Sequence, residues 1–246
     1  MRAAASIVKL DLRGVRRDHV ALATVLLSII GVAGITVLGA FQHRLAGWQA
    51  WFPFIVAVSL VGGPSGFGFL SGLLMVEEGD TAVRDALAVT PISPRVLLLV
   101  RTVVATAWMA VWPLASVYLM NWTWGALHLS LMDWLALVIP LALMTPAFAL
   151  LIPALAHDKV GALAVFKGLS FVTLFPLVMF FIPVDAGYRP VLLASPTGWV
   201  IEAYLAFLGD RPASGLRWSL GALLYAMTLL VIVVHLFQRK VYRTHL

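Results

Sequence analysis

Six long segments without a lysine, arginine, aspartate or glutamate dominate this sequence of 246 residues. Each is close to or longer than the ~17 to 25 residues that a helix needs to cross ~30 Å of hydrocarbon. Backbone groups in lipid must bond within their own segment, and the alternating ~10-residue strands of a membrane barrel are not seen. The sequence therefore predicts an all-α membrane protein with six transmembrane helices. The six segments are 19–43, 45–76, 102–132, 134–157, 168–184 and 218–238.

The positive charges follow this pattern and predict its orientation. If both termini are cytoplasmic, 13 of the 17 lysine and arginine residues fall on cytoplasmic segments. This asymmetry is what the positive-inside rule predicts. A nucleic-acid-binding protein would instead need a contiguous basic face, so the net charge of +6 does not indicate that class of partner. The four basic residues left outside are Arg44, Arg189, Arg211 and Arg217.

The N-terminal residues 3–17 place Ala5, Val8 and Leu12 on one helical face and basic side chains on the other. This pattern predicts an amphipathic helix on the inner membrane surface, although a positive flank that only orients the first span would look similar. No cleavage-like site ends the following apolar run, so we expect the first span to be retained. Without a linker, low-complexity tract or convincing repeat, residues 1–246 are predicted to form a single domain.

The second span is rich in glycine and contains two Gly-x-x-x-Gly spacings, Gly62 with Gly66 and Gly68 with Gly72. Small residues at this spacing allow another helix to approach closely. Packing within the chain and contact with a second subunit both remain open from the sequence. In the third span, Trp108 and Trp112 are one helical turn apart. They could line a hydrophobic translocation path, or they could serve ordinary helix packing.

The second half of the chain contains signals for helix starts and one charged residue within a predicted span. Ser130 and Asp133 are suited to cap the start of the fourth span, and Ser195 followed by Pro196 is a helix start. The latter predicts a short helix up to Leu208 in the outer segment. Because Glu202 is its only charge, this piece is expected to be half-inserted as a re-entrant helix before the last span. Lys167 lies in the fifth span, near enough to the inner surface to extend its amine there.

The chain lacks the groups that catalysis would need. It has no cysteine, its six histidines have no metal-ligand spacing, and the spans contain no aspartate or glutamate. No serine hydrolase, zinc protease or Gly-x-x-x-x-Gly-Lys-Ser/Thr nucleotide-binding motif occurs. We therefore predict that the chain is not an enzyme, and that it needs neither a cofactor nor a metal. If it pumps, the energy must come from another chain.

The first predicted cytoplasmic loop, residues 77–94, holds the most informative pattern. Gly79 is expected to end the second span, and Pro91 to end a new helix that begins near Thr81. On that helix, Val83, Leu87 and Thr90 share one face. A short amphipathic helix fixed between two spans can transmit a push to both, whereas a lipid-surface helix is the alternative.

This loop, with the glycine-rich span before it, resembles the permease subunits of type-2 ABC exporters, in particular the small fluoroquinolone-export-like permeases. The run Glu-Glu-Gly-x-Thr-x-x-x-x-x-Leu-x-Val-Thr-Pro-Ile-Ser carries the resemblance. It implies that the 81–90 helix is a coupling helix that docks on an ATPase subunit. It also implies an interfacial N-terminal helix, an outer re-entrant segment and a bacterial inner-membrane location. The expected docking residues are Glu77, Glu78, Gly79, Thr81, Val83, Leu87, Thr90 and Pro91.

The resemblance implies a membrane subunit of an ATP-driven exporter. Its partners would be separate ATPase subunits, membrane lipids and a second permease, identical or not. Because the spans have almost no charged groups, a hydrophobic or amphipathic molecule such as a drug or lipid is a more plausible substrate than a small ion. Two alternatives stay open from the sequence. One is a membrane-embedded enzyme or assembly factor at the lipid interface, and the other is an ion-coupled carrier.

Overall fold

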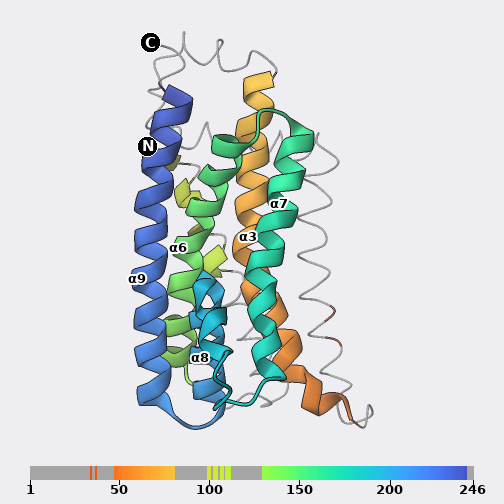
Figure 1. Ribbon diagram of the computed structural model, residues 1–246, viewed down its shortest axis with the longest axis vertical. Coiled ribbons are helices and arrows are strands. Elements are labelled where there is room, and N and C mark those ends of the chain that lie inside the picture. Colours follow the sequence, from red (N-terminus) through yellow and green to blue (C-terminus); the bar gives the residue numbers. More distant parts are fainter. Residues whose placement is uncertain are drawn as a thin grey trace.

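The computed structural model describes Gly34, Val37 and residues 47–80, 99–100, 102–104, 106–107, 109–111 and 129–242. Every regular element in these residues is helical, which confirms the all-α prediction (Figure 1). The α-helices are α3 (Phe52–Asp80), α6 (Leu131–Leu155), α7 (Lys159–Leu174), α8 (Pro196–Leu208) and α9 (Pro212–Phe237). Shorter 3-10 elements are η2 (Trp48–Trp51), η3 (Phe175–Phe180) and η4 (Arg189–Ala194), and η5 (Gln238–Tyr242) is a π-helical turn.

Four helices of the described part are long and apolar enough to cross a membrane: Phe52–Glu77, Leu131–Leu155, Lys159–Phe180 and Pro212–Lys240. They match the second, fourth, fifth and sixth predicted spans. A shorter apolar helix, Thr102–Val111, matches part of the third. The first span and the N-terminal helix over residues 3–17 fall almost entirely outside the described residues.

The described helix boundaries follow the local sequence. Ser130 and Asp133 form a complete capping box at the start of α6, as predicted. Asp158 caps α7 by accepting a hydrogen bond from the Gly161 amide at 2.6 Å. Helix α3 includes Gly79 and is described as far as Asp80, one residue beyond the predicted break, and helix ends are defined only to about one or two residues.

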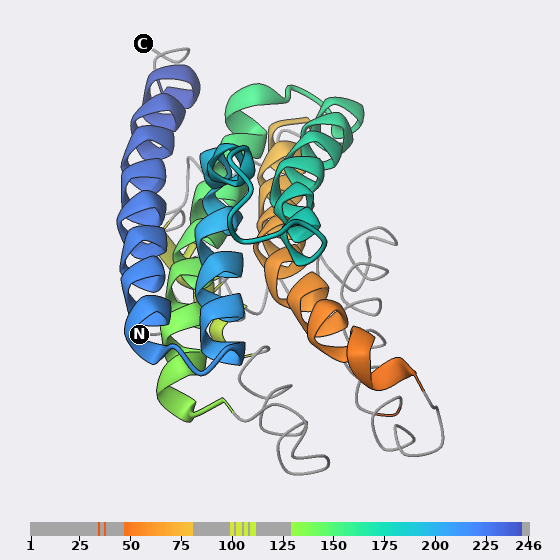
Figure 2. The same ribbon diagram turned by 60° about the horizontal axis from the view of Figure 1, so that its bottom comes forward.

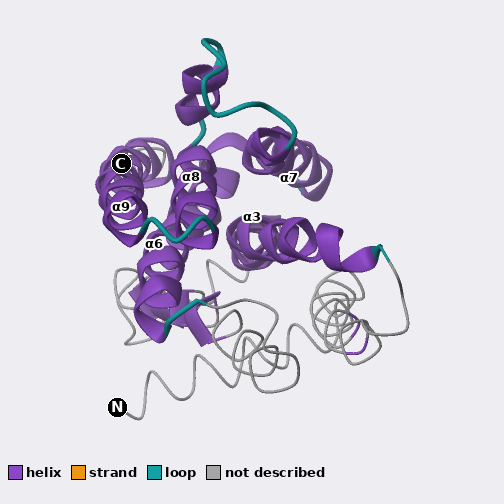
Figure 3. Cartoon of the chain, turned by 90° about the horizontal axis from the view of Figure 1, so that it is seen from below, coloured by secondary structure: helices purple, strands orange, loops and turns teal. Residues whose placement is uncertain are grey.

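Helix α6 lies at the centre of the bundle, between α3 and α9, and α7 packs on the other side of α3 (Figures 1 and 3). The approach of α3 to α6 depends on Gly68 and Gly72. A Cβ atom at Gly68 would lie 2.7 Å from the Phe148 Cβ, and one at Gly72 would lie 2.8 Å from the Ile152 Cβ. This second Gly-x-x-x-Gly pair therefore serves packing within the chain. Gly66, in the first pair, has nothing within 4 Å of such an atom.

The two ends of the bundle differ in chemistry. At one end, here called the Glu77 end, α3 finishes, α7 begins and α9 runs into η5 (Figure 1). Lys159, Arg239 and Lys240 lie there. At the other, the Trp51 end, Trp51 and Phe54 form an aromatic cluster with Phe181. Under the predicted orientation the Glu77 end is cytoplasmic, and the aromatic cluster is placed like the interfacial belts of membrane proteins.

Candidate functional site

The described part of the docking motif begins on the last turn of α3. Glu77 and Lys159 form an ion pair in which the amine donates to the carboxylate at 2.7 Å, and this pair ties the end of α3 to the start of α7. Glu78 and Gly79 continue α3. The other predicted docking residues lie outside the described part of the chain, so their role stays a prediction. They are Thr81, Val83, Leu87, Thr90 and Pro91.

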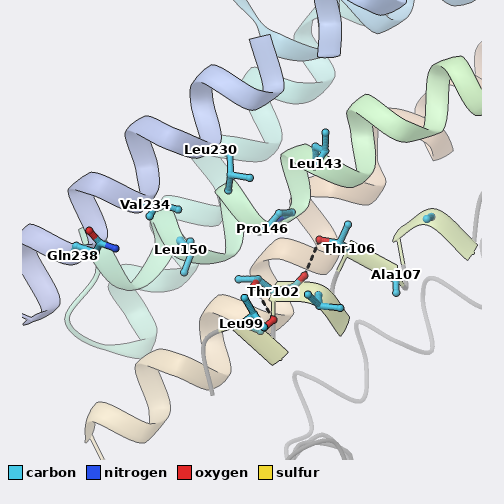
Figure 4. Close-up of a pocket in the computed structure, with 12 residues that line it drawn as sticks. Leu99, Thr102, Thr106, Ala107, Leu143, Pro146, Leu150, Leu230, Val234 and Gln238 are labelled. Carbon is cyan, nitrogen blue, oxygen red and sulfur yellow. Dashed lines mark hydrogen bonds between the residues drawn. The ribbon is translucent and has the colours of Figure 1, made fainter. Parts of the chain in front are cut away.

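A cavity of about 910 Å³ opens between three helical segments near the Glu77 end (Figure 4). Its size is at the upper end of the ~300 to 1,000 Å³ typical of small-molecule sites. The lining residues that the structure describes are all uncharged. The lining residues are Leu99, Thr102, Val103, Thr106, Ala107 and Ala110 from the third span, Leu143, Pro146 and Leu150 from α6, and Leu230, Val234 and Gln238 from α9.

The few polar groups of this cavity are largely occupied. The Thr102 hydroxyl donates to the Leu99 carbonyl at 3.0 Å, and the Thr106 hydroxyl donates to the Thr102 carbonyl at 2.7 Å (Figure 4). Both hydroxyls are thereby held against their own helix, which leaves methyl groups for the cavity. Gln238 supplies an exposed amide at the end nearest the basic η5 turn. The cavity is suited to an apolar group with a polar end.

The predicted path residues Trp108 and Trp112 lie outside the described residues, although their neighbours Ala107 and Ala110 line the cavity. Sequence reasoning missed the cavity itself because its wall combines segments more than 30 residues apart. Lys167 is exposed on α7, eight residues after Lys159. At 1.5 Å per residue this places it about 12 Å from the helix start, within reach of the membrane surface for a long side chain.

At the Trp51 end, α8 occupies the predicted position and begins deep in the bundle, with α3, α6, α7 and α9 around it (Figures 2 and 3). The Ser195 hydroxyl donates to the Val172 carbonyl and the Thr197 hydroxyl to the Thr173 carbonyl, each at 2.8 Å. Both acceptors lie in α7 before η3 begins. The chain therefore turns back inward after η3, and α8 runs outward again to the start of α9.

A buried ion pair holds this inward turn together. The Arg189 guanidinium, on η4, donates through Nε to the Glu202 carboxylate at 2.5 Å and through Nη2 at 3.2 Å. Its Nη1 donates to the Met179 and Ile182 carbonyls at 3.1 and 2.7 Å. Arg189 is only 4% exposed. Four donated bonds thus join η3, η4 and α8, so Arg189 is an internal structural residue rather than the outer-loop charge that the sequence suggested.

The family model described as "Fluoroquinolones export permease protein Rv2686c-like" matches residues 11–234, which is most of the chain. The protein belongs to this family of export permeases. A search of curated proteins gave no significant match. Family membership and the four apolar helices together make the chain a multi-pass membrane protein with a role in transport.

Within this export permease, the described features separate into two regions. The Glu77 end carries the start of the predicted docking motif, where Glu77 pairs with Lys159, and the cavity. The Trp51 end carries the inward-turning α8 with its buried charge pair. Helix α3 runs between them as one element of 29 residues with Pro64 in its interior.

Proposed function

We propose that this permease is the membrane-spanning subunit of an ATP-driven ABC exporter of type 2 in a bacterial inner membrane. Two permeases, identical or not, pair with two separate ATPase subunits, which hydrolyse ATP. The 81–90 segment is the coupling helix that rests on the ATPase. ATP binding pushes this helix and switches a pathway between the two permeases from inward to outward access.

The observation that carries the proposal is the mechanical continuity of α3 with the docking motif. The motif begins on the last turn of α3, where Glu77 is joined to Lys159 of α7. Farther along, Gly68 and Gly72 allow α3 to pack closely against α6, with no room for a Cβ atom at either position. A push on the segment after Asp80 would therefore move α3 together with α6 and α7 as one body.

The substrate that this chain suits best is a hydrophobic or amphipathic molecule entering from the bilayer. The family description names fluoroquinolones, so drug-like amphipathic compounds are the first class of substrate to assay. The described spans offer such a molecule apolar surfaces and few charges. Moving a small hydrated ion would instead require charged or strongly polar groups within the spans.

A docking test uses Leu87→Asp, which introduces a charge on the apolar face of the proposed coupling helix. We expect the variant to reach the membrane but to lose co-purification with the ATPase subunit and drug-stimulated ATP hydrolysis. Val184→Asp is the matched control, because Val184 is 67% exposed in the turn at the Trp51 end. The control should retain both properties. Full transport by the permease alone in liposomes, driven by a proton gradient, would refute the proposal.

A charge-reversal series tests the Glu77 to Lys159 connection. The two side chains are 30% and 51% exposed, so their pairing should add less than about 1 kcal/mol to stability. Lys159→Glu should therefore leave the melting temperature nearly unchanged while lowering the transport coupled to each ATP hydrolysed. Combining it with Glu77→Lys should restore coupling in part. A pair without a role in coupling would instead leave the transport coupled to each ATP hydrolysed normal in both variants.

A further inference from the structure

We propose that the cavity at the Glu77 end is a binding site for an anionic phospholipid of the inner leaflet. One acyl chain occupies the cavity, and the phosphate group lies at its Gln238 end beside the basic η5 turn. The inference does not depend on an ATPase partner, since it concerns this chain and the membrane alone.

The cavity wall matches an acyl chain. It is built from leucine, valine, alanine and proline side chains on three helices, and its two threonine hydroxyls are turned to their own backbone. None of the described lining residues carries a charge, so a charged ligand buried whole would lose its hydration without a partner among them. An apolar chain pays no such penalty. Several side chains bordering the opening are also exposed, with Leu99 at 63% and Val103 at 57%, as is usual for surfaces that contact lipid.

The end of the cavity supplies the complementary charge. Gln238 lines the cavity and also begins η5, in which Arg239 and Lys240 are exposed. Both basic residues lie within one helical turn of the cavity end. Basic residues between transmembrane helices on the cytoplasmic side attract anionic headgroups. An apolar cavity whose Gln238 end is followed directly in the chain by exposed cations matches a lipid with a negative headgroup better than a neutral or cationic amphipath.

The depth of the cavity agrees with the inner leaflet. Under the positive-inside orientation, Gln238 lies near the cytoplasmic surface and Leu143 lies deeper, about midway along α6 (Figure 4). The cavity therefore runs from the headgroup level toward the middle of the bilayer. This is the direction that an acyl chain of the inner leaflet takes.

The test is a lipid titration of the purified full-length permease in neutral detergent, followed by native mass spectrometry. Phosphatidylglycerol and phosphatidylcholine with identical acyl chains are the two probes. We expect phosphatidylglycerol to bind more tightly. The double variant Arg239→Gln with Lys240→Gln should weaken its binding about 30-fold, from about 1 kcal/mol for each cation. The matched control, Arg211→Gln with Arg217→Gln at the Trp51 end, should leave the affinity unchanged.

A second variant separates the chain-binding cavity from the headgroup contact. Ala110→Trp places a large ring in the cavity and should lower the binding of both lipids. The proposal is overturned if phosphatidylcholine binds as tightly as phosphatidylglycerol. It is also overturned if the two double variants weaken phosphatidylglycerol equally, or if a folded Ala110→Trp protein binds it normally. Each of these results leaves the ATP-driven exporter proposal untouched, because no ATPase is present.

Discussion

Removing one member of the buried Arg189–Glu202 pair should be the most damaging polar substitution in the described residues. Glu202→Gln keeps the shape of the side chain but removes its charge. The guanidinium would then keep its two backbone carbonyl partners, on Met179 and Ile182, and lose its counter-charge. We expect the inward turn before α8 to loosen, because this arginine joins three elements at once.

The size of the effect follows from the burial of both side chains. The Arg189 side chain is 5% exposed and the Glu202 side chain is 13% exposed, so solvent screens the pair little. Breaking a buried pair by removing one partner costs about 3 to 5 kcal/mol. The two remaining carbonyl contacts favour the lower value, about 3 kcal/mol. For a chain of this length, about 2 to 4 °C per kcal/mol gives a fall in melting temperature of about 6 to 12 °C.

The assay is thermal unfolding of the purified permease in a non-ionic detergent, followed by tryptophan fluorescence. Arg217→Met is the control, since Arg217 is an exposed arginine on α9 that contacts its own helix turn. It should change the melting temperature by no more than about 2 °C, as surface substitutions do. The melting temperature of the double variant Arg189→Met with Glu202→Gln should fall by less than the sum of the falls in the two single variants. The reasoning fails if Glu202→Gln melts within the range of the control.

Two further substitution pairs test the packing of α3 and the anchoring of α8. Gly68→Ala brings a Cβ atom to 3.0 Å from a backbone carbonyl of α6 and should lower the stability of the fold by about 1 to 3 kcal/mol. Gly66→Ala is the control: a Cβ atom there has nothing within 4 Å, so the substitution should be neutral or slightly stabilising. Thr197→Val removes the buried hydrogen bond to the Thr173 carbonyl and should cost about 1 kcal/mol, while Thr228→Val at an exposed site on α9 should not. Both pairs are read by melting temperature, and equal shifts within a pair would contradict the structure.

Local sequence signals predicted the elements that depend on neighbouring residues. The Ser130 capping box and the Ser195–Pro196 helix start both appear at their predicted positions. Four of the predicted spans are present, with ends that differ from the charge-free segments by up to nine residues. Such features are encoded within one or two helical turns, so one sequence suffices to read them. Helix α3 is likewise described to Asp80, one residue beyond the break predicted at Gly79.

Contacts between distant segments could not be read in the same way. Glu77 and Lys159 are 82 positions apart, and the cavity wall needs three helices in register. Neither pattern follows from a single helix, because each depends on how the helices pack. The charge pattern alone assigned Arg189 to an outer loop, where a hydrated arginine needs no partner.

Glu202 nevertheless carried a usable signal. It is the only charged side chain in the apolar helix α8, and a carboxylate in such surroundings requires a cation or several donors close by. The nearest arginine before it in the sequence is Arg189, in a segment that must fold back for α8 to enter the bundle. A solitary charge on a predicted re-entrant helix therefore predicts two things at once: an ion partner in the flanking segment, and the inward turn that brings that partner within reach.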